Sequence, residues 1–208
     1  MKFVASTLLS CLLLASAASA YTAEDREASI KWVTGLGFPN LKAWSMMTPK
    51  MLKTVLNIYT TSMKEDSFEY FTPAEIEVVY AAVSASNNCE LCLSFHSMMM
   101  GKGGHASDDI KEIVAGGLPK EKKIRGAVVA AKYALAHKGV FLDREKKHLK
   151  ALGYEGEKLA ELNFMVGLMS SMNQNYVHLI SEGLEVEEFL QQAGPFADTV
   201  YAHGKDDL

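Results

Sequence analysis

Apolar positions recur mainly every three or four residues along this chain, which is the period of an amphipathic helix. No alternation of apolar and polar residues, the pattern of a half-buried strand, continues beyond about five residues. The pattern predicts an all-α domain of about seven to nine helices. The expected helices begin at Pro49, Thr72 and Cys89 and then cover residues 107–115, 120–137, 144–152, 155–172 and 173–192.

Residues that begin and end helices support this division. The segment Thr72-Pro73-Ala74-Glu75 has the form of a capping box, with proline at the first helical position. Glycine pairs and Gly-Pro steps follow several of the expected helices, as helix ends do. No proline-rich, serine-rich or charged linker divides residues 21–208, so we expect one domain there.

Residues 1–20 have the composition of a secretory signal. Lys2 gives a basic start, residues 3–14 are apolar, and Ala18-Ser19-Ala20 forms a small-residue cleavage site. This apolar run is too short for a membrane span, and no later stretch is continuously apolar for long enough. We therefore expect a mature chain from Tyr21 onward without a membrane span.

The last four residues, Lys205-Asp206-Asp207-Leu208, differ from the Lys-Asp-Glu-Leu retention signal by one side-chain methylene. Together with a signal peptide, this ending predicts retention in the lumen of the endoplasmic reticulum. Secretion is one alternative. Two-step targeting to a plastid is another, because Tyr21 is an aromatic residue directly after the cleavage site.

Composition excludes some classes of function. The 208 residues are 49% hydrophobic and 22% charged, with a formal net charge of -4. A chain without a broad basic surface is a poor nucleic-acid binder, so we expect no nucleic-acid partner. Three cysteines are too few for a disulfide scaffold, and Cys11 lies in the signal. Cys89 and Cys92 remain, and their spacing carries the chemistry.

Two cysteines and a histidine follow one another at helical spacing. Cys89 and Cys92 are three positions apart, and His96 lies four positions beyond Cys92. A helix that begins at Cys89, after the expected capping residues Asn87-Asn88, carries all three on one face. Two thiols one turn apart can close a disulfide, and the amides of a helix N-terminus stabilise a thiolate. His96 can take or return a proton near neutral pH.

Glu77 lies twelve positions before Cys89, inside the preceding helix. If the chain reverses at Asn87-Asn88, Glu77 lies roughly 15 Å back along one helix, at about 1.5 Å per residue. His96 then lies roughly 12 Å along the other helix, nearly level with Glu77 and facing it. A carboxylate in this position orients an imidazole and holds it as a base. The spacing predicts a Glu77–His96 hydrogen bond beside the thiol pair.

The pattern of Glu77, Cys89-x-x-Cys92 and His96 resembles the signature of the alkylhydroperoxidase-D-like, or carboxymuconolactone-decarboxylase-like, family. The likeness covers roughly residues 49–180. It includes the Thr48-Pro49 helix start, Ala81-Ala82-Val83-Ser84, the turn at residues 115–119 and residues 159–175. The resemblance implies an all-α fold, subunits that associate into trimers or larger rings, and reduction of hydrogen peroxide or alkyl hydroperoxides by the cysteine pair.

The resemblance also implies the role of each residue. Cys92 attacks the peroxide, Cys89 resolves the sulfenic acid, His96 is the base and Glu77 orients it. Helix-dipole reasoning alone favours Cys89 as the more acidic thiol, whereas the one-turn spacing to His96 favours Cys92. The family's founding peroxidase has a histidine directly before its second cysteine, where this chain has Leu91. The relay expected here is therefore shorter, from Glu77 through His96 to a thiol.

Other interpretations of the cysteine pair are a thiol–disulfide oxidoreductase acting on proteins, an oligomeric helical protein with a structural disulfide, and a lactone decarboxylase. Decarboxylase relatives do without the cysteine pair, which argues against the last. A zinc site at Cys89, Cys92 and His96 lacks a fourth ligand at suitable spacing. We therefore expect no metal and no cofactor. The expected partners are a peroxide, a dithiol or disulfide-reductase reductant, and further copies of the chain.

Overall fold

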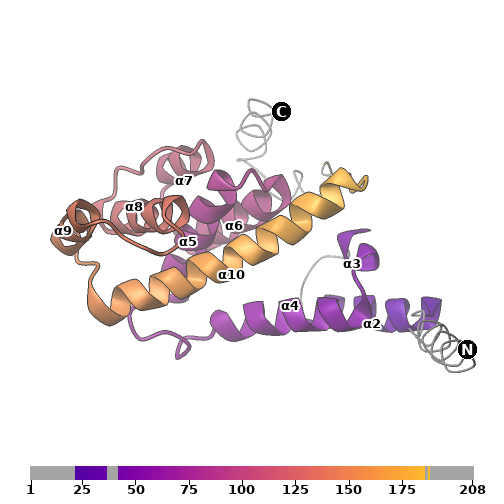
Figure 1. Cartoon of the computed structure of the whole chain (residues 1–208). Coiled ribbons are helices and arrows are strands. Elements are labelled where there is room, and N and C mark those ends of the chain that lie inside the picture. The colour runs from indigo at the N-terminus through magenta and orange to yellow at the C-terminus, as the bar shows by residue number, and fades with distance from the viewer. Residues whose placement is uncertain (1–21, 37–41, 186, 188–208) are drawn as a thin grey trace, which may run out of the picture. The chain divides into compact units, whose positions relative to one another are not determined.

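The computed structural model describes residues 22–36, 42–185 and 187 (Figure 1). The signal predicted for residues 1–20 and the ending at residues 205–208 lie outside these residues. Within them the chain forms helices and no strand, which confirms the predicted all-α fold. The nine helices of the described residues are α2 (Ala23–Gly35), α3 (Lys42–Met46), α4 (Pro49–Ser62), α5 (Pro73–Ser86), α6 (Glu90–Lys102), α7 (Ser107–Val114), α8 (Lys122–Ala136), α9 (Asp143–Ala151) and α10 (Gly156–Ser181).

The chain divides into two compact units, one up to Leu56 and one from Asn57 onward. In the first unit, Thr22 caps α2 with the reciprocal bonds of a capping box. Arg26 of α2 donates to the backbone carbonyl oxygens of Ser45 at 2.6 Å and Met47 at 3.2 Å. These bonds hold the end of α3 against α2. The single domain expected for residues 21–208 stays a prediction.

The second unit is built around α5. Residues 76–85 of this helix are all buried, so it is enclosed on every side rather than along one stripe. It packs against α6, α7, α8 and α10. The predicted capping box begins α5: Thr72 Oγ1 accepts from the Glu75 backbone, and Glu75 accepts from the Thr72 backbone at 3.0 Å. A helix fixed at its start and buried along its length is a rigid support for a site.

A tight turn joins α5 to α6. Asn87 ends α5, and Asn88 has a φ of 52°, the left-handed conformation that asparagine tolerates better than most residues. Cys89 is itself the N-cap of α6, and its N–H donates to the Ser84 carbonyl at 3.0 Å. The expectation that the two asparagines cap α6 is therefore wrong, because both are used in ending α5 and reversing the chain.

Helix α10 runs unbroken through the position where two helices were expected. The prediction of separate helices at residues 155–172 and 173–192 is wrong, and Gln192 itself lies outside the described residues. Asn173, the first residue of the second expected helix, lies inside α10. Its side chain is fully buried and bonds instead to residues of α5 and the turn after it. No helix among the described residues is both long enough and apolar enough to cross a bilayer.

Candidate functional site

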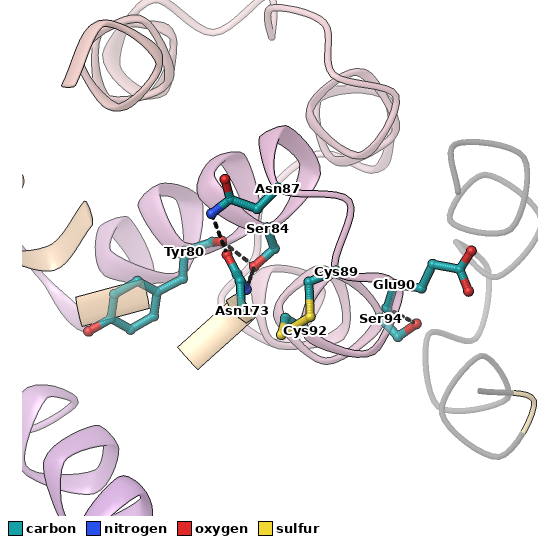
Figure 2. Close-up of a disulfide and its surroundings, with 8 residues drawn as sticks. All are labelled: Tyr80, Ser84, Asn87, Cys89, Glu90, Cys92, Ser94 and Asn173. Atoms are coloured by element: carbon teal, nitrogen blue, oxygen red, sulfur yellow. Dashed lines mark hydrogen bonds between the residues drawn. A yellow bond between two sulfur atoms is a disulfide. The ribbon is translucent and has the colours of Figure 1, made fainter. Parts of the chain in front are cut away.

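Cys89 and Cys92 form a disulfide at the start of α6, with their Cα atoms 5.3 Å apart (Figure 2). Cys89 is the N-cap and Cys92 lies in the first turn, so the bridge joins side chains one turn apart. The two residues are 0% and 2% exposed. The intervening Glu90 directs its carboxylate away from the sulfurs (Figure 2). The carboxylate nearest to the cysteines in sequence therefore does not lie beside the disulfide.

Glu77 and His96 meet across the α5–α6 hairpin. Nδ1 of His96 lies 2.6 Å from Oε2 of Glu77, and each residue is 2% exposed. The hydrogen bond predicted from the spacing is therefore present. An ionised Glu77 accepts from Nδ1–H, which leaves Nε2 of the neutral imidazole as a proton acceptor. Such charge-assisted bonds are short and strong, and this one fixes both the tautomer and the direction of the ring.

Sequence reasoning missed a third member of this group, Tyr59. Its hydroxyl donates to Oε1 of Glu77 at 2.8 Å, so the carboxylate has a partner on each oxygen. Burial above all, and then the negative charge of Glu77, raise the pKa of Tyr59 far above its ordinary value of 10.0. The hydroxyl therefore remains a donor throughout the physiological range. The spacing of Tyr59 from Leu52 and Leu56 is typical of an apolar helix face, but a buried tyrosine hydroxyl needs a polar partner, and that rule could have identified Tyr59 as a candidate for the site.

Aromatic rings surround the imidazole. The ring centroids of Tyr59, Tyr80 and Phe95 lie 6.2, 5.3 and 5.3 Å from that of His96. The hydroxyl of Tyr80 donates to Ser62 Oγ at 3.1 Å and does not bond to Glu77. Burial raises the pKa of Tyr80 to about 12. The Glu77–His96 pair is thus held in an environment of low polarity, where a hydrogen bond to a charged carboxylate is strong.

A second polar group lies in the surroundings of the disulfide (Figure 2). Asn173 of α10 donates to Ser84 Oγ at 3.1 Å and accepts from Asn87 Nδ2 at 3.0 Å. Ser84 in turn donates to the Tyr80 carbonyl at 2.7 Å. These bonds tie α10 to both sides of the turn that presents Cys89.

The sequence that contains most of this site matches a known protein family. Residues 49–135 match the model of the carboxymuconolactone decarboxylase family. This region of the chain belongs to that family. No match was found among the curated proteins. The matched region begins at the first residue of α4 and ends inside α8, so it includes Tyr59, Glu77, both cysteines and His96. Membership supports a peroxidase-like or related function, and the predicted catalytic roles of the individual residues stay predictions.

The carboxymuconolactone decarboxylase region supplies the whole Tyr59–Glu77–His96 group, whereas Asn173 comes from α10, beyond the matched residues. Leu91, at the position where the sequence resemblance would place a histidine, is 5% exposed. Among the described residues, no group of three or more histidine, cysteine or acidic side chains is arranged to hold a metal ion.

Proposed function

We propose that this chain is a thiol peroxidase that reduces hydrogen peroxide or alkyl hydroperoxides with its cysteine pair, as an antioxidant of the secretory pathway. The observation that carries the proposal is a disulfide at a helix N-terminus, one turn before a histidine that is oriented by a buried glutamate. Each part has a function in thiol chemistry: the helix end favours a thiolate, and the oriented imidazole moves its proton.

The first step begins from the reduced pair. His96 Nε2 takes the proton of the attacking thiol, and the thiolate sulfur attacks one peroxide oxygen. The O–O bond breaks as the S–O bond forms, so sulfur is oxidised to a sulfenic acid and the peroxide is reduced. The departing alkoxide or hydroxide takes the proton from the imidazolium and leaves as an alcohol or water. Glu77 holds the ring through Nδ1 during both transfers.

The second thiol then condenses with the sulfenic acid, forming the S–S bond and releasing water. The structure contains this oxidised form. A dithiol reductant returns the pair to two thiols by exchange and becomes a disulfide itself. We assign the attack to Cys92 and the resolving step to Cys89, because His96 is four positions, or one helical turn, beyond Cys92.

The burial of the sulfurs favours a small oxidant over a protein substrate. Exchange with a protein requires a thiolate of that protein to reach a disulfide sulfur directly. Residues that are 0% and 2% exposed do not present such a sulfur on the surface of this chain. A peroxide reacts through two oxygens and needs far less room. A protein thiol–disulfide oxidoreductase is therefore the second choice.

The catalytic test is consumption of hydrogen peroxide or an alkyl hydroperoxide by the full mature chain with a small dithiol as reductant. Cys92→Ser should abolish turnover, and Glu77→Gln should lower the rate at least about tenfold, the effect of losing one strong hydrogen bond to a charged group. Glu75→Gln is the matched control, since Glu75 lies on the same helix but bonds to Thr72. Turnover that persists in Cys92→Ser would contradict the proposal.

Two further measurements separate the alternatives. A reduction potential below about -300 mV would indicate a structural bridge instead of a redox-active one.

For the location, we propose the lumen of the endoplasmic reticulum on the basis of residues 1–20 and the terminal Lys205-Asp206-Asp207-Leu208. Removal of residues 205–208 should release an internally tagged chain into the medium. Release of the full chain at the same rate would indicate secretion.

A further inference from the structure

The carboxylate of Glu77 is held by two donors that come from two different helices. His96 of α6 lies at one oxygen and Tyr59 of α4 at the other, at 2.6 and 2.8 Å. All three residues are buried, with exposures of 2% for Glu77, 2% for His96 and 6% for Tyr59. A buried carboxylate keeps its charge only when such donors replace water. The two contacts therefore have different consequences: the contact with His96 orients the imidazole, and the contact with Tyr59 stabilises the charge of the carboxylate.

We propose that Tyr59 is a positioning residue of the proton relay, whose hydroxyl bonds to Oε1 of Glu77, stabilises the buried charge and so holds the carboxylate with Oε2 toward His96. The inference rests on the relay in the proposed function. Without the Tyr59 hydroxyl, the buried carboxylate of Glu77 has lost one of the two donors seen here, and its other oxygen is no longer fixed in direction. A carboxylate that is less well stabilised and less well oriented supports an imidazolium less, so the thiol gives up its proton to His96 less readily.

Other ionisable groups on the surrounding helices do not supply this function. Tyr80 of α5 donates to Ser62, and Asp109 of α7 accepts from the Lys120 backbone at 2.5 Å. Lys132 of α8 donates to the Gly116 carbonyl. Burial raises the pKa of Tyr176 of α10 above its ordinary value. Within the described residues, the hydrogen-bonding partners of the Glu77 carboxylate are thus Tyr59 and His96.

Tyr59→Phe removes only the hydroxyl, and Tyr80→Phe is its matched control. Both tyrosines are buried, both rings lie near His96, and only Tyr59 bonds to Glu77. The measurement is the ultraviolet absorbance of the thiolate in the reduced full chain as a function of pH, with the matching Cys92→Ser protein as blank. We expect Tyr59→Phe to move the midpoint to higher pH and to lower the thiolate fraction near neutral pH about tenfold. Tyr80→Phe should change that fraction less than about twofold, since Tyr80 does not bond to Glu77.

A merely structural role would give a different result. Loosened packing would reduce the amplitude of the titration or the stability of both variants and leave the midpoint in place. A midpoint for Tyr59→Phe that matches Tyr80→Phe, or that moves to lower pH, would overturn the inference. If Tyr59→Phe does not fold, Tyr59→Met provides the test, because it also removes the hydroxyl and leaves a large apolar side chain. Its midpoint should likewise move to higher pH, and an unchanged midpoint would overturn the inference.

The titration uses no peroxide, so its outcome is separate from that of the activity assay. If the titration midpoint moves to higher pH in Tyr59→Phe but the wild-type protein consumes no peroxide, the role of Tyr59 is supported and the proposed function is contradicted. Peroxide turnover in a protein whose Tyr59→Phe variant titrates like the wild type would leave the proposed function standing and overturn the role of Tyr59.

Discussion

Asn173 provides a direct test of how α10 holds the turn before the cysteine pair. Its side chain is 0% exposed and makes two hydrogen bonds, to Ser84 Oγ at 3.1 Å and from Asn87 Nδ2 at 3.0 Å. Asn173→Ala removes both bonds and leaves the partly buried Asn87 amide without this acceptor. At about 1 kcal/mol for each lost bond, plus part of the cost of an unsatisfied donor, the free energy of unfolding should fall by about 2–3 kcal/mol.

Asn175→Ala is the matched control, because the residue type and the helix are the same. Nδ2 of Asn175 is buried without a hydrogen-bond partner among the described residues. Its removal gives up no bond, and alanine favours the helix, so the cost should stay below about 1 kcal/mol. Urea unfolding of the oxidised proteins, followed by circular dichroism, measures both values. Equal costs for the two variants would refute the idea that the Asn173 bonds hold α10 to the turn.

Three further predictions concern stability. Reduction of the disulfide should lower the free energy of unfolding by no more than about 2 kcal/mol, because the bridge closes a very short loop; a loss of helical circular dichroism on reduction would contradict this. Burial raises the pKa of Tyr80 from 10.0 to about 12, so its stabilising contribution is complete below pH 10.0 and declines up to about pH 12. The contribution of Tyr80 to this decline is about 1.4 kcal/mol per pH unit, so in urea unfolding the stability of Tyr80→Phe should fall less steeply than that of the wild type by this amount. Gly126→Ala should destabilise α8 by about 1–3 kcal/mol, because the added Cβ would lie 2.6 Å from the Tyr154 ring. In Gly167→Ala the added Cβ would meet nothing within 4 Å, so this variant should stabilise α10 by roughly 0.5–1 kcal/mol. Thermal melts of the two glycine variants measure both effects.

The Glu77–His96 contact could be predicted from the sequence because it depends on local geometry. Two regular helices joined by a tight turn fix the level of each side chain through the rise per residue alone. The turn is at Asn87 and Asn88 as expected, although these residues end one helix and Cys89 begins the next. The error in capping did not change the register, so the distance prediction held.

The contacts that the sequence did not reveal join segments far apart in the chain. Tyr59 reaches Glu77 across 18 positions and an irregular connection, whose path the apolar pattern does not determine. Asn173 reaches Ser84 and Asn87 across 89 and 86 positions. A polar residue within an apolar pattern is consistent with a helix start or with a buried, satisfied side chain. Only the tertiary partners distinguish the two, and for Asn173 they favour the second.

The burial of the disulfide has opposite consequences for the two halves of the proposed cycle. Oxidation needs only that a peroxide reach one sulfur, and the aromatic surroundings of His96 strengthen the hydrogen bonds that move its proton. Regeneration needs a thiolate to approach a disulfide sulfur of Cys89 or Cys92, residues that are 0% and 2% exposed. The burial that surrounds the site during oxidation therefore also restricts regeneration, and a small dithiol should reduce the disulfide faster than a folded protein dithiol of similar potential. Equal rates for the two reductants would contradict this reasoning.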